Sequence, residues 1–517
     1  MEFVINGVGR KIPTYIEKIG ELKPYMGQDQ VSVEGRKHAP LKAQSHRDST
    51  KLLPTIRAAI EKSGLRDGMT ISFHHHLRNG DYVLSKVMEE IAGMGIKDLT
   101  ICASSLTDAH ESLIEHIKNG VVAGLQTSGL RGRLAREISE NCILEKPVIF
   151  RTHGGRARAI EAGDVKIDVA FIAASCCDEM GNMNGQKGKS AFGSMGYPMV
   201  DAYYADKVIA ITDNLVPYPA YPISIPQTLV DYVVVIDEIG NPQQIGEGAT
   251  RVTKNPMELL IAEYAGRVLT ASGYVKQGFS FQAGSGGPSL AVAKYLREYM
   301  RENNITGSFA SGGITSFMVE MLEEGFFGAL LDVQTFDSVA AASFNRNKNH
   351  IEMSAGMYAN PHNKGCVTNN LDIMILSATE VDTSFNVNVM TASTGVIMGA
   401  QGGHPDTAAG TKLTVLVTPL IRKRIPIIVD RVTTVITPGD TVDVVVTERG
   451  IAVNPKNTGL LERLRCTDLP IVTIEELRDK AEAITGKPDK IEPGDKIVGI
   501  IEYRDGTIMD TISNIVK

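Results

Sequence analysis

One stretch of the sequence occurs twice, and this repeat limits the folds that the chain can adopt. The first copy, DVAFIAASCCDEMGNMNG, starts at Asp168, and the second, DIMILSATEVDTSFNVNV, starts at Asp372. Each copy is a short apolar run that ends in a polar, turn-prone segment, which is typical of a buried strand whose C-terminal end leads into a loop. Ligands bind at that edge of open α/β sheets, so the repeat predicts two similar α/β halves that share one site.

The two copies differ at one chemically important position. Cys176 in the first copy corresponds to Glu380 in the second. A carboxylate at a strand end can be a nucleophile toward a thioester or can position a substrate, although a capping or solvated carboxylate is the more common role. Other positions keep their polar character, because the copies align Asp168 with Asp372, Ser175 with Thr379, Asp178 with Asp382, Asn182 with Asn386 and Asn184 with Asn388.

Further matches in the same order indicate a duplicated domain. Residues 71–73 (ISF) resemble residues 279–281 (FSF), and LIEHIKNGVVAGLQTS resembles MVEMLEEGFFGALLDVQ. Strand and helix patterns alternate in both halves, which favours mostly parallel sheets. For a chain of 517 residues we expect more than one domain. The patterns divide it into an irregular N-terminal arm, a first α/β domain, and a second α/β domain with a β-rich C-terminal part, at residues 1–50, 51–243 and 244–517.

Composition excludes several classes of function. The chain is 43% hydrophobic and 22% charged, as in globular proteins, and no apolar run approaches the ~20 residues that span a bilayer. The N-terminus lacks the apolar core of a signal peptide, and the six cysteines form no CxxC pair. The net charge of −7 gives no general affinity for nucleic acid. We therefore expect a cytoplasmic protein that binds neither membrane nor nucleic acid.

Two glycine-rich segments are candidate anion sites. Gly402 and Gly403 in MGAQGGHPD can expose adjacent N–H groups as an oxyanion hole, although a tight loop is an equally good interpretation. Gly284, Gly286 and Gly287 in AGSGGPSL precede a predicted helix and can hold the phosphate or carboxylate of a cofactor. That segment lacks the third glycine of the dinucleotide fingerprint, and NMNGQKGKS lacks the first glycine of a P-loop. Neither segment supports ATP or NAD binding.

Basic and imidazole side chains are candidates for binding a polyanionic substrate by charge-assisted hydrogen bonds. Neighbouring residues of a strand point to opposite faces, so the run 74–76 (HHH) favours anion binding or plain structure over a metal site. We expect no metal. Vicinal Cys176 and Cys177 are interpreted as buried structural thiols. The substrate-binding candidates, for which a solvated surface loop is the alternative, are Arg346, His362, Lys364 and His404.

Several long strings resemble the α subunit of citrate lyase over nearly the whole chain. They are SFHHHLRNGDYV, CCDEMGNMNGQKGKSAFGSMGY, EMSAGMYANPHNKG and ATEVDTSFNVNVMTASTG. More distantly, ATEVDTSFNVN with GAQGGHPD and VTERGIAV resembles the acetyl-CoA hydrolase and CoA-transferase superfamily. The resemblance implies two open-sheet α/β domains of the CoA-transferase type.

The resemblance also implies an acyl exchange, in which acetyl-[acyl carrier protein] and citrate give citryl-[acyl carrier protein] and acetate. The thioester would belong to a dephospho-CoA-type prosthetic group on the small carrier (γ) subunit, with no cofactor bound covalently to this chain. A citryl lyase (β) subunit would then cleave the citryl thioester, in a larger complex that contains more than one copy of this chain. Glu380 matches the superfamily's nucleophile, and Gly402 and Gly403 match its oxyanion loop.

Two questions stay open at the level of sequence. Glu380 would either carry the acyl group covalently or orient citrate in a ternary complex, in which the citrate carboxylate attacks the thioester itself. The alternative activity is that of an acyl-CoA hydrolase or a general CoA-transferase that uses free CoA. A non-catalytic scaffold is less consistent with the presence of both Glu380 and the glycine pair.

Overall fold

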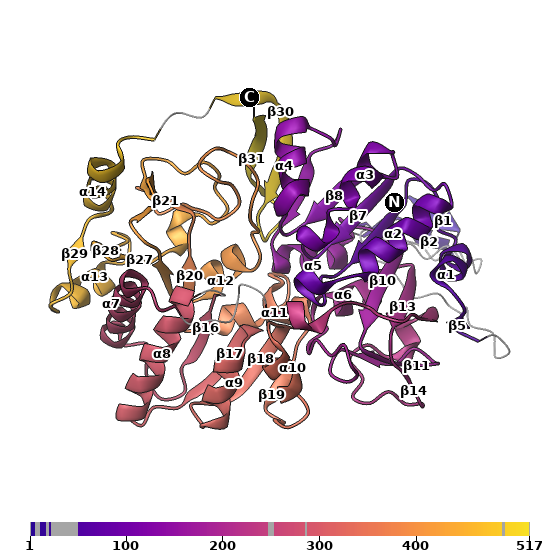
Figure 1. Cartoon of the computed structure of the whole chain (residues 1–517), viewed down its shortest axis with the longest axis horizontal. Coiled ribbons are helices and arrows are strands. Elements are labelled where there is room, and N and C mark those ends of the chain that lie inside the picture. Colours follow the sequence, from indigo (N-terminus) through magenta and orange to yellow (C-terminus); the bar gives the residue numbers. More distant parts are fainter. Residues whose placement is uncertain are drawn as a thin grey trace.

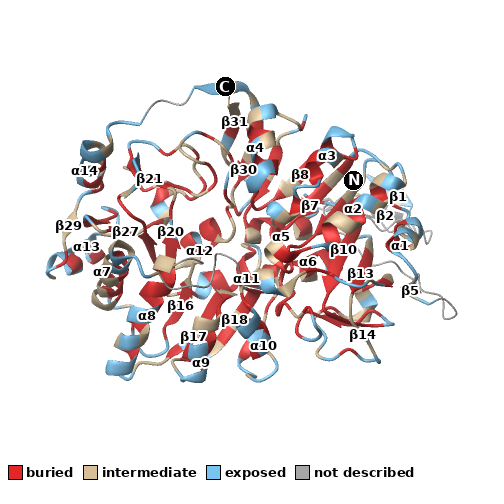
Figure 2. Cartoon of the chain, viewed as in Figure 1, coloured by how far each residue is buried: buried red, intermediate tan, exposed pale blue. Residues whose placement is uncertain are grey.

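The computed structural model describes residues 2–5, 11–16, 20–21, 50–246, 253–284, 287–488 and 492–515. Its two α/β halves lie side by side, the first in indigo to magenta and the second in red to yellow (Figure 1). Each half is built on one large sheet that is parallel over most of its width. Buried residues, drawn in red in Figure 2, follow the strands of both sheets.

The first half alternates strands and helices. Its sheet has the parallel strand order β9 (Val148–Arg151), β8 (Val122–Thr127), β7 (Leu99–Ala103), β6 (Thr70–Phe73), β10 (Val169–Ala174), β13 (Lys207–Thr212), β15 (Tyr232–Val235) and β5 (Leu52–Leu53). The helices between these strands are α1 (Ile56–Ser63), α2 (Val83–Gly93), α3 (Leu113–Lys118), α4 (Gly132–Asn141), α5 (His153–Ala162) and α6 (Tyr197–Tyr204).

The second half repeats this order. Its sheet runs β19 (His350–Glu352), β18 (Phe327–Thr335), β17 (Gly307–Ile314), β16 (Ser280–Ala283), β20 (Ile373–Ser377), β23 (Leu413–Val417) and β27 (Val444–Thr447), then antiparallel β28 (Gly450–Val453) and β29 (Ile471–Val472). Its helices are α7 (Pro256–Ser272), α8 (Gly287–Glu302), α9 (Ser316–Glu323), α10 (Ser338–Ser343), α11 (Ala355–Ala359), α12 (His404–Gly410), α13 (Thr458–Arg465) and α14 (Ile474–Thr485). Seven strands therefore correspond in order, which confirms the predicted duplication.

The repeated stretch has the same local structure in both halves. Asp168 and Asp372 each accept the backbone N–H of the neighbouring strand, from Thr70 and Ser280, at 2.8 Å. After the strand, each copy forms a small three-stranded sheet. These sheets are β12 (Met183–Asn184), β11 (Cys176–Asp178) and β14 (Leu215–Val216) in the first half, and β22 (Val387–Asn388), β21 (Glu380–Asp382) and β26 (Ile428–Val429) in the second.

The C-terminal hairpin departs from the expected division of the chain at residues 243/244. Strands β30 (Pro493–Glu502) and β31 (Ile508–Ile515) form a hairpin, and β30 pairs in parallel with β9 of the first sheet. Glu502 accepts hydrogen bonds from Arg151 (2.9 Å) and Arg158 (3.1 Å) of the first half. A free sheet edge exposes unpaired backbone groups, and this hairpin covers that edge. Residues 493–515 therefore belong structurally to the first half.

The predicted arm and linker lie mostly outside the described residues. Within residues 1–50, β1 (Phe3–Ile5) pairs with β2 (Lys11–Pro13), and β3 (Tyr15–Ile16) pairs with β4 (Gly20–Glu21). The polar linker after the first domain contains residues 247–252, which the structure does not describe. Within the described ranges, no helix is both long and apolar enough to span a membrane.

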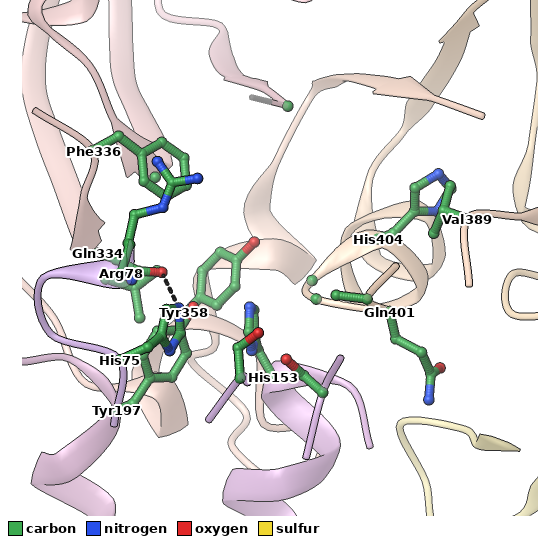
Figure 3. Close-up of a pocket in the computed structure, with 18 of the residues that line it drawn as sticks. His75, Arg78, His153, Tyr197, Gln334, Phe336, Tyr358, Val389, Gln401 and His404 are labelled. Atoms are coloured by element: carbon green, nitrogen blue, oxygen red, sulfur yellow. Dashed lines mark hydrogen bonds between the residues drawn. The ribbon is translucent and has the colours of Figure 1, made fainter. Parts of the chain in front are cut away.

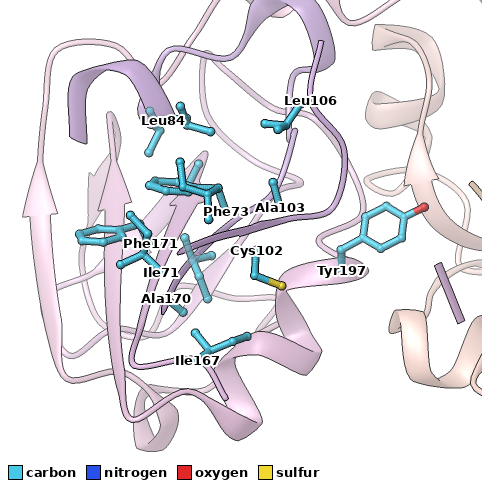
Figure 4. Close-up of a cluster of buried hydrophobic side chains, with 14 of the residues drawn as sticks. Ile71, Phe73, Leu84, Cys102, Ala103, Leu106, Ile167, Ala170, Phe171 and Tyr197 are labelled. Carbon is cyan, nitrogen blue, oxygen red and sulfur yellow. The ribbon is translucent and has the colours of Figure 1, made fainter. Parts of the chain in front are cut away.

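Packing around the central strands fixes the first sheet. Phe73 of β6 stacks on Phe171 of β10 with ring centroids 5.4 Å apart, and both rings are buried (Figure 4). Cys102, Cys176 and Cys177 are also buried, free thiols, in agreement with the structural role predicted for the vicinal pair. Apolar burial of this kind is worth about 25 cal/mol per Å². It positions the carboxyl ends of the strands and the loops that follow them.

Candidate functional site

A cavity of about 330 Å³ lies between the two halves, at the carboxyl ends of their parallel strands. The first half contributes the loops that follow β6, β7, β8 and β9, and the second half contributes the ends of β16, β17, β18 and β20. Figure 3 shows labelled side chains from both halves around this space. The cavity therefore occupies the sheet edge at which open α/β folds bind ligands.

The glycine-rich loop 399–403 forms one wall and is hydrogen-bonded to the first half. The N–H of Leu130 donates to Gly399 O (2.9 Å), that of Gln401 donates to Ser128 O (2.8 Å), and that of His153 donates to Gly402 O (2.8 Å). These bonds fix the direction of the loop backbone. They also explain why the loop, which belongs to the second half in sequence, is positioned by the first.

Gly402 and Gly403 line the cavity, and their N–H groups have no acceptor within the described ranges. Gly402 has φ +55°, which favours glycine, and a Cβ on Gly403 would lie 2.5 Å from Tyr358 Oη. Tyr358 in turn accepts a hydrogen bond from Gln282 Nε2 at 2.8 Å. Two adjacent free N–H groups at a cavity wall are the donors that an oxyanion requires.

Of the three consecutive histidines, only His75 lines the cavity. Its Nδ1 lies 2.6 Å from Ser104 Oγ and its Nε2 lies 3.1 Å from Gln334 Oε1, so Nε2 carries the proton that it donates across the two halves. Burial lowers the pKa of His75 well below its usual value. His74 and His76 make other contacts, and no cluster of metal-ligating side chains occurs in the described part of the chain.

Two further cavity histidines are held neutral. His404 contacts Thr437 Oγ1 through Nδ1 (2.7 Å) and Ser377 O through Nε2 (3.1 Å), and burial lowers its pKa to about 4. His153 packs against the ring of Tyr197 with centroids 4.5 Å apart. Burial, aided by the nearby guanidinium of Arg156, lowers the pKa of His153 to about 3. At neutral pH these two rings therefore carry no charge.

The positive charge of the cavity comes from Arg78 and Arg131. The Arg78 guanidinium lies over the Phe336 ring, 5.0 Å from its centroid, and donates to Ile245 O at 3.1 Å. Burial and the neighbouring Arg131 lower the pKa of Arg78 to about 10, so it stays protonated. Neither arginine forms an ion pair with any described residue, and no Asp, Glu, Lys or Cys is among the described residues that line the cavity.

Glu380 is buried outside this lining. Its Oε2 accepts from Asn388 Nδ2 (2.8 Å) and from the Thr433 N–H (2.8 Å), and its Oε1 accepts from Thr433 Oγ1 (3.1 Å). Only 4% of the residue is exposed to solvent. In this conformation the carboxylate accepts three hydrogen bonds from the second half and is not among the described residues that line the cavity.

The other predicted residues are divided between the cavity and the surface. Gly284 and His404 line the cavity together with the glycine pair, whereas Gly287 begins α8 outside the lining and Gly286 lies outside the described residues. Arg346 pairs on the surface with Glu323 at 2.8 Å. His362 and Lys364 are exposed and lie outside the lining. The structure therefore does not bring these three basic residues to the cavity.

Sequence reasoning missed Arg78, Arg131, His153 and Gln334 as cavity residues. Arg78 and Arg131 follow β6 and β8, and His153 is the first residue of the helix that follows β9. Gln334 is the penultimate residue of β18. The strand-end rule, applied to every strand instead of to the repeated stretch alone, predicts such positions. Polar side chains close to the carboxyl end of each predicted strand would therefore have indicated these cavity residues.

This chain is similar to known proteins over most of its length. The family model described as "Citrate lyase, alpha subunit (CitF)" matches residues 49–515. The citrate lyase α chain of Haemophilus influenzae is 54% identical over 462 residues, which are 89% of this chain and 92% of the relative.

Solved structures give the same result. A chain of Streptococcus mutans assigned as the citrate lyase α subunit, crystallised in complex with citrate, superposes with a TM-score of 0.90 at 56% identity, over 95% of this chain and 96% of that chain. The 4-hydroxybutyrate CoA-transferase of Porphyromonas gingivalis shares the fold, with a TM-score of 0.53 at 17% identity over 84% of this chain and 96% of that chain. The chain therefore belongs to the citrate lyase α-subunit family.

Proposed function

We propose that this chain is the enzyme of the transferase step of citrate lyase, which converts acetyl-[acyl carrier protein] and citrate into citryl-[acyl carrier protein] and acetate. Membership of the family supports this activity. The relative from Streptococcus mutans was crystallised with citrate, which supports citrate as the acceptor. Carrier (γ) and citryl lyase (β) subunits are the proposed partners, in a cytoplasmic complex that contains more than one copy of this chain.

One observation carries the proposal: the cavity combines two arginines that lack acidic partners with two free glycine N–H groups. A tricarboxylate needs cationic partners, and Arg78 and Arg131 supply them. An acyl exchange needs donors for a transient oxyanion, and Gly402 and Gly403 supply these. His75 and His404 use both ring nitrogens in contacts with the protein, whereas Nδ1 of the neutral His153 has no partner among the described residues.

The exchange then proceeds in two additions on the same pair of donors. A citrate carboxylate oxygen attacks the carbonyl carbon of the acetyl thioester, and the N–H groups of Gly402 and Gly403 bind the oxyanion that forms. Collapse breaks the C–S bond and gives a thiolate and a mixed acetyl–citryl anhydride. The thiolate attacks the citryl carbonyl, and acetate leaves with the electrons of the broken anhydride bond. The thioester bond is conserved, so no nucleotide is consumed.

The composition of the cavity supports this ternary route over a glutamyl intermediate. A carboxylate nucleophile must reach the thioester carbonyl at about 3–3.5 Å. No carboxylate is among the described residues that line the cavity, and three hydrogen bonds hold Glu380 elsewhere. We infer that Glu380 keeps the loop of Thr433 in place instead of becoming acylated.

The substrate arm is proposed to be the dephospho-CoA-type group of the carrier, which donates the thioester to the cavity. Gly284 at the carboxyl end of β16 lines the cavity, and a Cβ there would lie 3.3 Å from Ile375 O, which is closer than an ordinary contact. Glycine in such a loop permits close approach of a ligand to the backbone.

The test is a single-turnover exchange with the purified chain. Acetylated carrier or acetyl-dephospho-CoA is mixed with radiolabelled citrate, and labelled citryl thioester is separated from citrate. A parallel reaction without citrate is quenched with hydroxylamine or borohydride to trap any acyl-enzyme. Citryl thioester without a trapped adduct is the expected result.

Two other results would change the assignment. A trapped adduct that disappears in Glu380→Gln would establish the covalent route. Turnover with free acetyl-CoA and acetate or succinate, but not with citrate, would support the alternative, a general CoA-transferase.

A further inference from the structure

The internal duplication shows which parts of the second half the fold itself does not need. In the first half, residues 213–214 alone connect β13 to β14. In the second half, residues 418–427 connect the corresponding strands β23 and β26, and they contain an antiparallel hairpin of β24 (Ile421–Arg422) and β25 (Ile425–Pro426). The first half forms the same sheet without this hairpin, so the hairpin is an addition to the half that contains Glu380.

The tip of the hairpin consists of exposed cations. Arg422, Lys423 and Arg424 are all exposed, and none forms an ion pair within the described ranges. Lys423 has φ +59°, a conformation that normally favours glycine or asparagine. Backbone preference therefore does not explain a lysine at this position. The three cations also stand together in a chain whose net charge is −7.

The base of the hairpin adjoins the cavity edge. Val417, the last residue of β23, pairs in register with Ser377 of β20, which lines the cavity. On the return strand, Ile427 O accepts the N–H of Val381, the neighbour of Glu380, at 2.8 Å. The hairpin therefore begins at the same edge of the second sheet as the cavity.

We propose that this hairpin binds an acidic surface of the subunit that presents the acyl thioester; this inference rests on the proposed function. The carrier has to bring its thioester to this cavity, and complementary charges at the rim of an interface raise the association rate without requiring tight binding. The three cations stand on an exposed turn instead of in a cavity, which suits the surface of a protein better than a small anion.

The test compares one substrate in two forms. The variant Arg422→Gln/Lys423→Gln/Arg424→Gln is assayed with carrier-bound acetyl thioester and with free acetyl-dephospho-CoA, each with citrate. We expect kcat/KM for the carrier-bound form to fall about tenfold at low salt, because rim charges act mainly on association. We expect the deficit to shrink at high salt, where charges are screened, and the value for the free thioester to be unchanged.

Two controls isolate the charge. Lys62→Gln/Arg66→Gln removes two exposed cations on the first half, which lie outside the cavity lining, and leaves both activities intact. Arg422→Lys/Arg424→Lys keeps the charge of the hairpin and retains activity with the carrier. Thermal unfolding of each variant verifies that the fold is unchanged.

Three outcomes overturn the inference. Equal losses with both thioesters would assign the cations to the prosthetic arm instead of the carrier protein. Unchanged kcat/KM with the carrier would remove any docking role. If the unmodified chain turns over neither thioester with citrate, the proposed function fails, and the inference fails with it.

Discussion

Gly403→Ala is the sharpest test of the oxyanion loop. The added Cβ would lie 2.5 Å from Tyr358 Oη, whereas ordinary contacts begin at 3.4 Å, so the loop or the ring must move by about 0.9 Å (3.4 − 2.5). Tyr358 is buried and accepts a hydrogen bond from Gln282, which limits its movement. Gly403 has φ −97°, so alanine meets no backbone restriction there. The variant therefore displaces the N–H group with little other change.

The expected cost follows from the loss of one oxyanion donor, which lowers kcat by roughly 10²–10³, or about 3–4 kcal/mol. We expect kcat for citryl thioester formation to fall about 100-fold. KM for citrate should stay within about threefold, because the arginines are unchanged and the loss is confined to the transition state. Steady-state transfer of radiolabelled citrate to the thioester measures both values.

Two companion variants make the test decisive. In Gly402→Ala the added Cβ would lie 3.6 Å from His153 Nε2, which is an ordinary contact. An alanine at the φ of +55° found there costs about 1 kcal/mol of stability. We expect it to lose less than about tenfold in kcat. Tyr358→Phe in the Gly403→Ala background removes the closest contact and leaves ring carbons at 3.1 and 3.2 Å, so it should restore part of the activity. A Gly403→Ala variant with normal kcat, or no recovery in the double variant, would refute the reasoning.

Three further predictions follow from the site. Glu380→Gln should lower the free energy of unfolding by about 1–3 kcal/mol, because it disturbs a buried group that accepts several hydrogen bonds. The variant should keep kcat within about tenfold of the unmodified chain. A folded variant without activity in the exchange assay would contradict this prediction. Arg78→Gln and Arg131→Gln should each raise KM for citrate about tenfold and leave KM for the thioester unchanged, in steady-state kinetics. The pKa of His404 is lowered to about 4, so between about pH 4 and 6.5 this side chain binds a proton in the unfolded chain but not in the folded chain. The free energy of unfolding should therefore rise by roughly 3 kcal/mol as the pH increases across that range. Denaturation measured at a series of pH values should show a smaller rise for His404→Gln.

Sequence alone predicted the two-fold repetition and its consequences. The matching Asp168 and Asp372 segments predicted paired strands, and each aspartate makes the same backbone hydrogen bond in its own half. Such patterns can be recognised in the sequence because strands, helices and the turns between them depend mainly on residues that are neighbours in the chain. The glycine pair at 402–403 was predicted from its local sequence and lines the cavity, and its role as an oxyanion hole stays a prediction.

Tertiary structure decided which side chains face the cavity. Glu380 could be a nucleophile by its residue type, but it is hydrogen-bonded to Asn388 and Thr433 and is not among the described residues that line the cavity. Arg78 and His75 reach the cavity only because the loop after β6 meets β18 of the other half, where His75 contacts Gln334.

The hairpin of β30 and β31 likewise joins the first sheet although it ends the second half in sequence. Pairings of this kind join residues hundreds of positions apart. They depend on which edges and surfaces remain free after local folding, and no local pattern encodes that information.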